Sequence, residues 1–418
     1  MNAPDMQRVR MSLPHFREFG WDPHVLTVDD AGDTPIDPLL SATVPADVEV
    51  ERVSSVPTSV AGAVGIGNIA LRALPWLYRA GARAIARHDI DLVYFSTTMF
   101  LSMPLGRMWR RRFGTPYVLD MQDPWLSDYY ATHPDTAPPP KYGLAHRLHA
   151  TLEPWTMRDV GGLIAVSDTY LTTLRQRYPW IDEASCATIP FAASRADFDM
   201  LTAHPQANGV FQSGNGAVQA LSVGRGGDDM RPALRVLFGA IRNGLSQAPA
   251  AFEPLRTYFV GTDYAAPDRA RKTVEPVAAE FGLTDRVVEQ TTRAPYFEAL
   301  QLMKDADVLM LIGSDDPAYT ASKVYPYLLA QKPIVAVVHE RSGLVPLLDH
   351  AASVLVTFSS ANEAAAVIEL TAKLRQFMEQ RPAARELSPE IERACSARDM
   401  TRRQCELFDR VAGPALAA

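Results

Sequence analysis

Short apolar runs alternate with longer helical stretches through almost all of this sequence. Most of the runs are continuously apolar, which is typical of strands buried on both faces of a parallel sheet. Helical patterns separate them, the clearest being residues 69–87, 232–243, 296–304 and 322–329. This alternation predicts βαβ units. The expected strands are residues 24–28, 91–95, 116–120, 162–166, 187–190, 219–223, 256–260, 286–290, 307–312, 333–338 and 353–356.

The strand–helix pattern occurs twice, so we expect two doubly wound, Rossmann-like domains facing each other across a cleft, the usual ligand position for such sheets. We assign residues 1–205 to an N-terminal domain and residues 218–387 to a C-terminal domain. Residues 206–217 contain few strong helix or strand formers and are expected to be a linker. Residues 388–418 return to a helical pattern, and we expect this helix to pack on the N-terminal domain.

The N-terminal domain has an unusual beginning. A doubly wound domain normally opens with a buried strand and a tight glycine turn, but here residues 6–19 have a helical pattern and the first strand follows at 24–28. Either the native start lies upstream, or the domain lacks its first strand.

Composition excludes several classes of protein. The 418 residues carry 48 acidic and 41 basic side chains, a formal charge of −7, which argues against a dedicated nucleic-acid binder. No run of about 18 uncharged apolar residues is present to span a membrane. Three cysteines are too few and too badly spaced for a zinc site or a disulfide framework. We therefore expect a reduced, cytoplasmic protein.

One glycine-rich turn follows an expected strand and leads into a helix. Gly224, Gly226 and Gly227 let the backbone approach a ligand closely, and Arg225 adds a cation able to bind two phosphate oxygens. The segment therefore indicates a phosphate site. Asp228 and Asp229 offer a structural alternative as helix caps.

A second polar loop, residues 313–323, also leaves a buried strand and enters a helix. Lys323 lies near that helix start, where a cation is unfavourable unless an anion is also present. The alternative is an ordinary solvated lysine. Because Pro326 is tolerated only in a first turn, the helix is expected to begin near Ser322 or Lys323.

Together these segments resemble the C-terminal half of nucleotide-sugar-dependent glycosyltransferases of the GT-B fold, especially family 4. The resemblance is carried by Ser222-Val223-Gly224-Arg225 and by the stretch from Ser322-Lys323-Val324-Tyr325 to Lys332-Pro333-Ile334-Val335-Ala336. In the first half, the stretch from Pro116 to Trp125, with Asp123-Pro124-Trp125, is similar to a family strand and loop. The family positions usually held by two glutamates carry Ala318 and Pro326 here.

The resemblance implies an enzyme that transfers a sugar from a UDP- or GDP-linked donor to a glycan, lipid-linked or small-molecule acceptor. It implies retention of configuration, with neither metal nor cofactor. Arg225, Lys323 and Asp123 would be the catalytic residues. The expected donor-binding residues are Gly224, Gly226, Gly227, Arg231, Asp315, Asp316, Ser322 and Tyr325.

Candidates for the acceptor side lie in the first half. They are Arg8, Arg10 and Trp125, and Asp123 is placed to bind an acceptor hydroxyl or, alternatively, to cap a turn. The run from Arg107 to Phe113 mixes cations with aromatic residues, which is the pattern of a peripheral contact with an anionic membrane but also of a solvated helix face.

Two other functions remain open from the sequence. A sugar-nucleotide epimerase of similar architecture would need carboxylates beside the anomeric carbon, and these are scarce around Ala318 and Pro326. A degenerate GT-B module could instead be the scaffold or partner of an active transferase. Nucleotide binding separates the scaffold from both enzymes.

Overall fold

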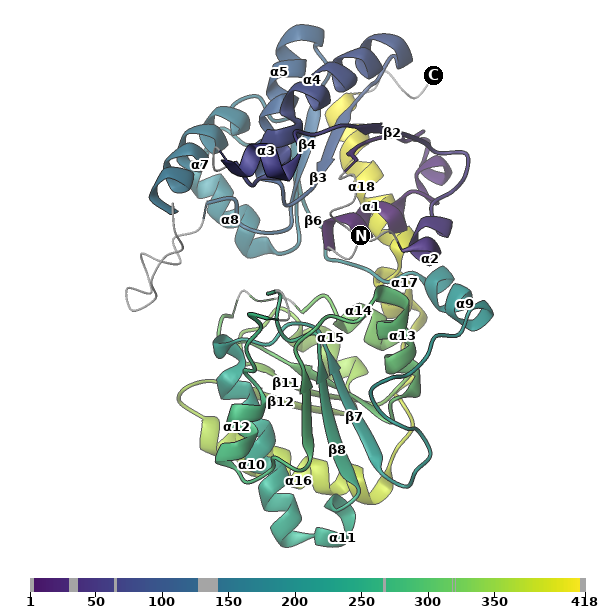
Figure 1. Cartoon of the computed structure of the whole chain (residues 1–418), viewed down its shortest axis with the longest axis vertical. Coiled ribbons are helices and arrows are strands. Elements are labelled where there is room, and N and C mark those ends of the chain that lie inside the picture. The colour runs from purple at the N-terminus through teal and green to yellow at the C-terminus, as the bar shows by residue number, and fades with distance from the viewer. Residues whose placement is uncertain are drawn as a thin grey trace. The chain divides into compact units, whose positions relative to one another are not determined.

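The computed structural model describes residues 4–29, 37–63, 66–126, 142–265, 268–317, 319 and 321–413. The chain forms two compact units (Figure 1): Met1–Phe191 together with Ala397–Ala418, and Ala192–Ser396. The chain therefore passes from one unit to the other twice, after Phe191 and after Ser396. Both units are built on parallel sheets, and the predicted α/β fold is confirmed.

The second unit contains one six-stranded parallel sheet with the order β9-β8-β7-β10-β11-β12. This is the doubly wound order 3-2-1-4-5-6, in which the direction of winding reverses between the first and fourth strands. The reversal therefore lies between β7 and β10. The strands are β7 (Val218–Val223), β8 (Leu255–Val260), β9 (Val287–Gln290), β10 (Val308–Ile312), β11 (Ile334–His339) and β12 (Val354–Phe358).

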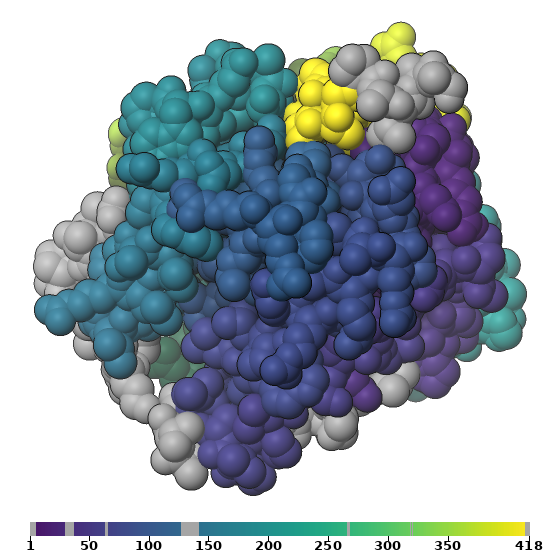
Figure 2. Space-filling view, turned by 90° about the horizontal axis from the view of Figure 1, so that it is seen from above, coloured from purple at the N-terminus to yellow at the C-terminus, as the bar shows by residue number. Residues whose placement is uncertain are grey.

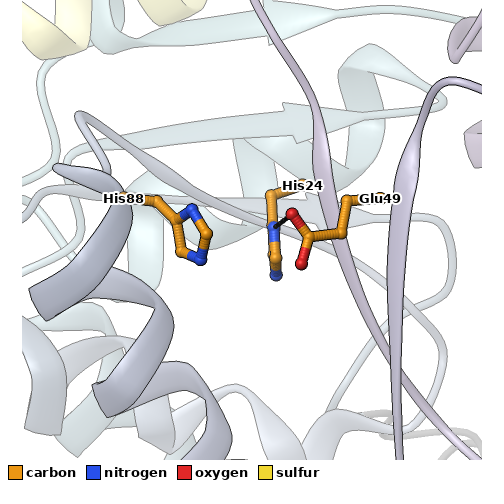
Figure 3. A group of neighbouring side chains, drawn as sticks. All are labelled: His24, Glu49 and His88. Atoms are coloured by element: carbon orange, nitrogen blue, oxygen red, sulfur yellow. Dashed lines mark ion pairs between the residues drawn. The ribbon is translucent and has the colours of Figure 1, made fainter.

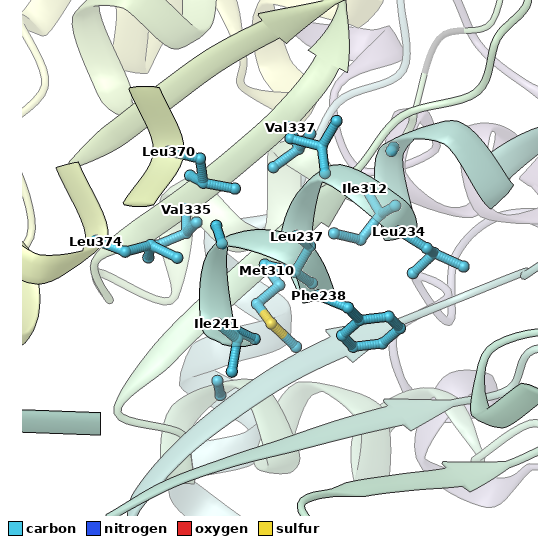
Figure 4. Packing of buried hydrophobic residues seen from close by; sticks show 14 of the residues in the cluster. Leu234, Leu237, Phe238, Ile241, Met310, Ile312, Val335, Val337, Leu370 and Leu374 are labelled. Atoms are coloured by element: carbon cyan, nitrogen blue, oxygen red, sulfur yellow. The ribbon is translucent and has the colours of Figure 1, made fainter. Parts of the chain in front are cut away.

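One core of the second unit lies between one face of this sheet and the helices α10 and α16, as Figure 4 shows. Leu234, Leu237, Phe238 and Ile241 recur at helical spacing on α10 and form its buried face. They pack with the side chains of strands β10 and β11 and with Leu370 and Leu374 of α16. The helices are α9 (Arg195–Ala203), α10 (Arg231–Gln247), α11 (Pro249–Phe252), α12 (Glu275–Glu280), α13 (Tyr296–Asp305), α14 (Val324–Leu329), α15 (Val345–Ala351), α16 (Glu363–Gln380) and α17 (Pro389–Ala394), with a 3₁₀ turn η4 (Asp228–Met230).

Residues 206–217, expected to be a linker, lie inside the second unit. The Asn208 side chain donates a hydrogen bond to Asp305 Oδ2 at 3.1 Å, and the Phe211 ring lies 5.0 Å from that of Tyr258. Helix α9, which we assigned to the N-terminal domain, also belongs to this unit. The scarcity of strong helix and strand formers correctly indicated that this segment is irregular. Side-chain contacts nevertheless fix the segment to the second sheet, so it is not a linker.

The first unit contains two separate parallel sheets. Strands β1 and β2 form one, and β3-β4-β5-β6 form the other. Among the described residues no strand joins β1 to β3, and none precedes β1. The strands are β1 (His24–Val28), β2 (Glu49–Val53), β3 (Val93–Ser96), β4 (Tyr117–Met121), β5 (Gly162–Ala165) and β6 (Cys186–Thr188).

The helices of the first unit cover both sheets, and the core includes Leu77, Trp109, Leu119 and Leu163. Gly81 permits close packing between α4 and α5, since a Cβ atom there would lie 2.2 Å from the Trp109 ring. The helices are α1 (Pro4–Ser12), α2 (Pro38–Ala42), α3 (Thr58–Ala63), α4 (Ile69–His88), α5 (Pro104–Phe113), α7 (Tyr142–Met157), α8 (Asp168–Arg177) and α18 (Ala397–Ala412), with 3₁₀ turns η1 (Phe16–Phe19), η2 (Phe100–Ser102) and η3 (Glu183–Ser185).

The C-terminal helix α18 packs within the first unit. Its Phe408 ring contacts the rings of Phe16, Trp21 and Tyr94, and its buried Gln404 accepts a hydrogen bond from Ser12 at 3.0 Å. In Figure 2 the yellow C-terminal residues lie among purple and teal residues of the first half of the chain. The last segment of the sequence thus completes the core of the first unit.

One local expectation was wrong, and one strand was missed. The helix expected over residues 6–19 is broken, because α1 ends at Ser12 and η1 begins at Phe16; Pro14 has no N–H to continue the helix. Strand β2 was not predicted, because Glu49, Glu51 and Arg52 interrupt its apolar pattern. Within the described ranges, no helix has the length and apolar character needed to cross a membrane.

Candidate functional site

The two loops singled out in the sequence meet at the carboxyl edge of the second sheet. Strands β7 and β10 are neighbours; β7 continues into Gly224-Arg225-Gly226-Gly227, and β10 continues into Gly313-Ser314-Asp315-Asp316. In doubly wound sheets, ligands bind outside the carboxyl ends of the strands where the winding reverses. The structure therefore places both loops at the expected ligand position of this unit.

The glycines of the first loop are required by its geometry. Gly224 has φ of 120°, a conformation that L side chains rarely adopt. At Gly226 a Cβ atom would lie 2.6 Å from the Thr273 hydroxyl oxygen, while its backbone N–H donates to the Thr262 carbonyl at 2.8 Å. The loop is thus held closely against the loop that follows β8.

Arg225 is held in place by a carboxylate and an aromatic ring. Its guanidinium donates to Asp229 Oδ1 at 3.0 Å and to Oδ2 at 2.7 Å, and it lies 4.7 Å from the centre of the Tyr319 ring. Burial alone would raise the pKa of Asp229, but the hydrogen bonds from Arg225 and Ser314 lower it. Asp229 therefore binds Arg225, and its side chain does not cap the helix.

Lys323 lies beside this pair and lacks such a partner. Its ammonium donates to the Ser222 hydroxyl oxygen, 3.4 Å away at the end of β7. Burial, and then the positive charge of Arg225, lower the pKa of Lys323 to about 8. Within the described part of the chain no carboxylate forms an ion pair with Lys323. This half-buried cation, with its charge uncompensated, is the strongest indication of an anionic ligand.

The second loop adds acidic groups to the same edge. The Asp315 N–H donates to the Asp229 carbonyl at 2.8 Å, and the Asp316 N–H donates to the Ser314 hydroxyl at 3.0 Å. Burial, followed by the charges of Asp229 and Asp316, raises the pKa of Asp315. Asp316 also lines a small pocket with Ser314, Tyr319 and His339.

Three other predicted donor residues lie near the loops with different surroundings. Ser322 is half-buried just before α14, and Tyr325 is buried in that helix. Helix α14 begins at Val324, one residue after Lys323, close to the predicted start. Arg231, at the beginning of α10, pairs with Glu280 of α12 instead of a group in the glycine loop. Ala318 lies outside the described residues.

The candidates of the first unit have different surroundings. Asp123 is exposed just after β4. Trp125 is buried, and its indole N–H donates to His149 Nδ1 at 2.7 Å. Arg10 is buried and donates to Gln7 and to the Thr43 hydroxyl at 3.0 Å. Of these side chains, only Asp123 is open to solvent.

Arg8 is fully buried in a polar cluster. Its Nε lies 3.0 Å from Asp120 Oδ2, and both side chains are 0% exposed. A second guanidinium nitrogen donates to the Ile189 carbonyl at 2.9 Å. Asp120 also accepts hydrogen bonds from Tyr94 at 3.0 Å and from Ser96 at 2.9 Å. These contacts tie α1 to β4 and to the residue that follows β6.

The basic run from Arg107 to Phe113 forms most of α5. Arg107 pairs with Asp159 at 2.6 Å, Arg110 donates to the Asp159 carbonyl, and Trp109 is buried. Arg111 and Arg112 remain exposed. The run from Arg107 to Phe113 therefore contains both residues that face the core and residues that face the solvent.

Sequence reasoning missed four groups at the loops of the second unit. Ser222 and Tyr319 contact the two cations, and Tyr264 lies 4.8 Å from the guanidinium of Arg293. Tyr264 and Arg293 follow β8 and β9. The only sequence signal for Tyr264 and Arg293 is their place after expected strands, because neither belongs to a recognisable motif.

Comparison with known proteins agrees with this architecture. Residues 7–192 match the family model described as a glycosyl transferase 4-like domain. None of the curated protein sequences matches this chain significantly. The UDP-glucose complex of HepE from Anabaena is similar, with a TM-score of 0.50, 16% identity and coverage of 94% of this chain and 98% of HepE.

Two other solved structures are similar over most of their length. A glycosyltransferase from Rickettsia africae ESF-5 has a TM-score of 0.55 and 12% identity, covering 98% of this chain and 95% of that one. The N-terminal domain of trehalose-6-phosphate phosphatase from Candida albicans has a TM-score of 0.56 and 12% identity, covering 96% and 93%. The chain therefore has the two-domain GT-B fold, and its residues 7–192 match the glycosyl transferase 4-like domain model.

Proposed function

We propose that the chain transfers a sugar from a UDP- or GDP-linked donor to a glycan, lipid-linked or small-molecule acceptor, with retention of configuration and without a metal or cofactor. The observation that carries the proposal is Lys323, a half-buried cation with no carboxylate partner in the described residues, beside Arg225 at the carboxyl edge of the sheet. The UDP-glucose bound by HepE supports a nucleotide-sugar donor.

In this proposal Arg225 and Lys323 bind the donor diphosphate. When the bond between the sugar and the diphosphate breaks, negative charge grows on the departing phosphate oxygens. Preorganised cations in a site shielded from water stabilise such charge more strongly than water does. Gly224 and Gly226 leave the backbone free to approach the phosphates, and Asp229 holds the guanidinium of Arg225 in a fixed orientation.

The acceptor is assigned to the first unit, where exposed Asp123 follows β4. Its carboxylate would accept a hydrogen bond from an acceptor hydroxyl. For a lipid-linked acceptor, exposed Arg111 and Arg112 of α5 would contact anionic headgroups at the cytoplasmic membrane surface. Polysaccharide synthesis is the process in which we place such a reaction.

A thermal-shift panel of UDP, GDP, ADP and their common sugar conjugates tests the donor assignment. At about 100 times its dissociation constant, a ligand should stabilise its unit by roughly 2.7 kcal/mol. A shift with one nucleotide supports the proposal and identifies the base. Release of free nucleotide upon addition of acceptor then separates a transferase from an epimerase. Absence of any shift would favour the scaffold hypothesis.

Replacing Arg225 with alanine should weaken binding of the nucleotide that gives the shift by roughly 1.5–3 kcal/mol, the usual contribution of a charged hydrogen bond. Calorimetric titration measures the loss directly. Arg235→Ala is a matched control, because Arg235 is also an arginine of the second unit but pairs with Glu280 and Glu363. Equal affinity in the wild type and Arg225→Ala would remove Arg225 from the donor site.

Nucleotide affinity should also fall as the pH rises through about 8. Lys323 has its pKa lowered to about 8, so its ammonium is charged at pH 7 and largely neutral at pH 9, whereas phosphate groups are already ionised above pH 7. The raised pKa of Tyr319 keeps that group neutral over the same range. Calorimetric titration of UDP from pH 7 to pH 9 measures the slope. The Lys323→Met variant should show a flat profile; an equal slope in both proteins would contradict the assignment.

A further inference from the structure

Three side chains with metal-ligating atoms gather in the first unit, in a part of the molecule that the proposed function does not use. His24 lies on β1, Glu49 on β2 and His88 at the end of α4, and one ligand atom of each lies within 4.8 Å of the others. Figure 3 shows both histidine rings and the carboxylate directed toward a common space. The residues are far apart in the sequence, so no spacing motif reveals them.

The pairing of β1 with β2 and the packing of α4 bring these three side chains together. His24 and Glu49 are register partners in the parallel β1–β2 pair, so their side chains stand on the same face of this sheet. Helix α4 packs against both strands and ends at His88. The rings of His24 and His88 consequently lie 4.9 Å apart. Three different elements thus each supply one ligand.

The imidazole of His24 has unused bonding capacity. Its Nδ1 lies 3.4 Å from Glu49 Oε2, a distance longer than that of a normal ion-paired hydrogen bond. Its Nε2 is inaccessible to solvent and finds no hydrogen-bond partner among the described residues, with Glu51 Oε2 4.0 Å away. Buried polar atoms without a partner are uncommon, and a bound cation would satisfy this one.

We propose that His24, Glu49 and His88 bind a divalent transition metal ion, with Zn²⁺ as the ion to test. Two imidazole nitrogens and a carboxylate form a ligand set that Zn²⁺ accepts, with a fourth position open to water or to Glu51. In a tetrahedral site with bonds of about 2.0–2.1 Å, ligand atoms are about 3.3 Å apart. Glu49 and His88 are exposed, so rotations of these side chains can close the remaining distance.

The surroundings leave the site accessible. A cavity of about 450 Å³ borders it, lined by Glu49, Glu51, Arg83, Arg87 and His88 among others. Arg83 pairs with Glu51 at 2.9 Å. The two arginines oppose a cation and the two carboxylates favour it, so the histidine nitrogens must supply the preference for a transition metal over Ca²⁺ or Mg²⁺.

Titration of the full-length, tag-free and metal-free protein with Co²⁺, followed by displacement with Zn²⁺, tests the proposal. Visible absorption bands of Co²⁺ report its coordination by the protein, and calorimetry gives the Zn²⁺ stoichiometry. We expect one ion per chain. His88→Gln and Glu49→Gln should each weaken Zn²⁺ binding at least tenfold, because even residues behind the ligands contribute 10–100-fold in known sites.

Exposed histidines of the second unit provide matched controls, since His204→Gln and His350→Gln remove an imidazole elsewhere and should leave binding unchanged. Because all six tryptophans lie between residues 21 and 180, their fluorescence checks that the variants keep the first unit folded. Zn²⁺ binding of wild-type strength in His88→Gln and Glu49→Gln, or no stoichiometric binding to the wild type, would overturn the proposal. Nucleotide binding is measured separately, so neither result bears on the donor site.

Discussion

Replacing Arg8 with methionine is expected to destabilise the first unit by about 3–5 kcal/mol, because removal of one member of a buried ion pair leaves the other charge unpaired in the core. Asp120 is 0% exposed and would keep only its hydrogen bonds from neutral side chains. Urea unfolding followed by tryptophan fluorescence measures the change, since every tryptophan of the chain lies in the first unit.

Two further variants serve as controls for the Arg8→Met prediction. Arg17→Met removes an arginine from exposed pairs with Asp22 and Asp47, and exposed pairs contribute about 0–1 kcal/mol. The double variant Arg8→Met/Asp120→Asn should lose less than the single variant, because neither charge then remains unpaired. If Arg8→Met unfolded at the same urea concentration as Arg17→Met, the buried cluster would not hold α1 in place.

Replacing Lys323 with methionine should have opposite effects on stability and on donor binding. Lowering the pKa of the ammonium from 10.5 to about 8 corresponds to about 3 kcal/mol at most. Because Lys323 is only half-buried, we expect a gain of about 1–2 kcal/mol in unfolding free energy at pH 7. The charged form is the one disfavoured in the folded protein, so the neutral methionine removes that cost. Nucleotide affinity should fall by roughly 1.5–3 kcal/mol.

Differential scanning calorimetry without ligand and calorimetric titration with UDP measure the two effects. Lys373→Met, which removes an exposed lysine paired with Glu369 on α16, should change neither. A less stable Lys323→Met protein that binds UDP like the wild type would show that this lysine is structural. The expected pattern is that of a binding group kept at the expense of stability.

The sequence predicted most of the strands because they are continuously apolar. Residues 307–312 contain β10, which is buried along its whole length, and residues 24–28 coincide with the half-buried β1. Strand β2 was missed because the face of Glu49 and Glu51 points toward the charged end of α4, where burial does not require apolar residues. The apolar pattern of a sequence predicts a strand only where the side chains of that strand are buried in the core.

The site was predictable in its position but not in its contacts. Glycine after a buried strand marked the loop of Arg225, because close backbone approach needs glycine there. That Asp229 would hold this arginine, or that Ser222 would lie beside Lys323, depends on loop conformation that no periodicity encodes. Arg8 was expected at an acceptor, yet it is buried with Asp120; a charged residue so deep in a core is rare unless paired.

The first unit is formed by two segments of the sequence that are far apart. Helix α18 lies in the core built by residues before 191, and the whole second unit is inserted between them. During synthesis the second unit is therefore complete on the ribosome while the first still lacks the helix that covers Tyr94 and Phe16. The apolar surface that α18 covers stays open until α18 itself has been translated, so the core of the first unit can be completed only after the whole second unit has been made.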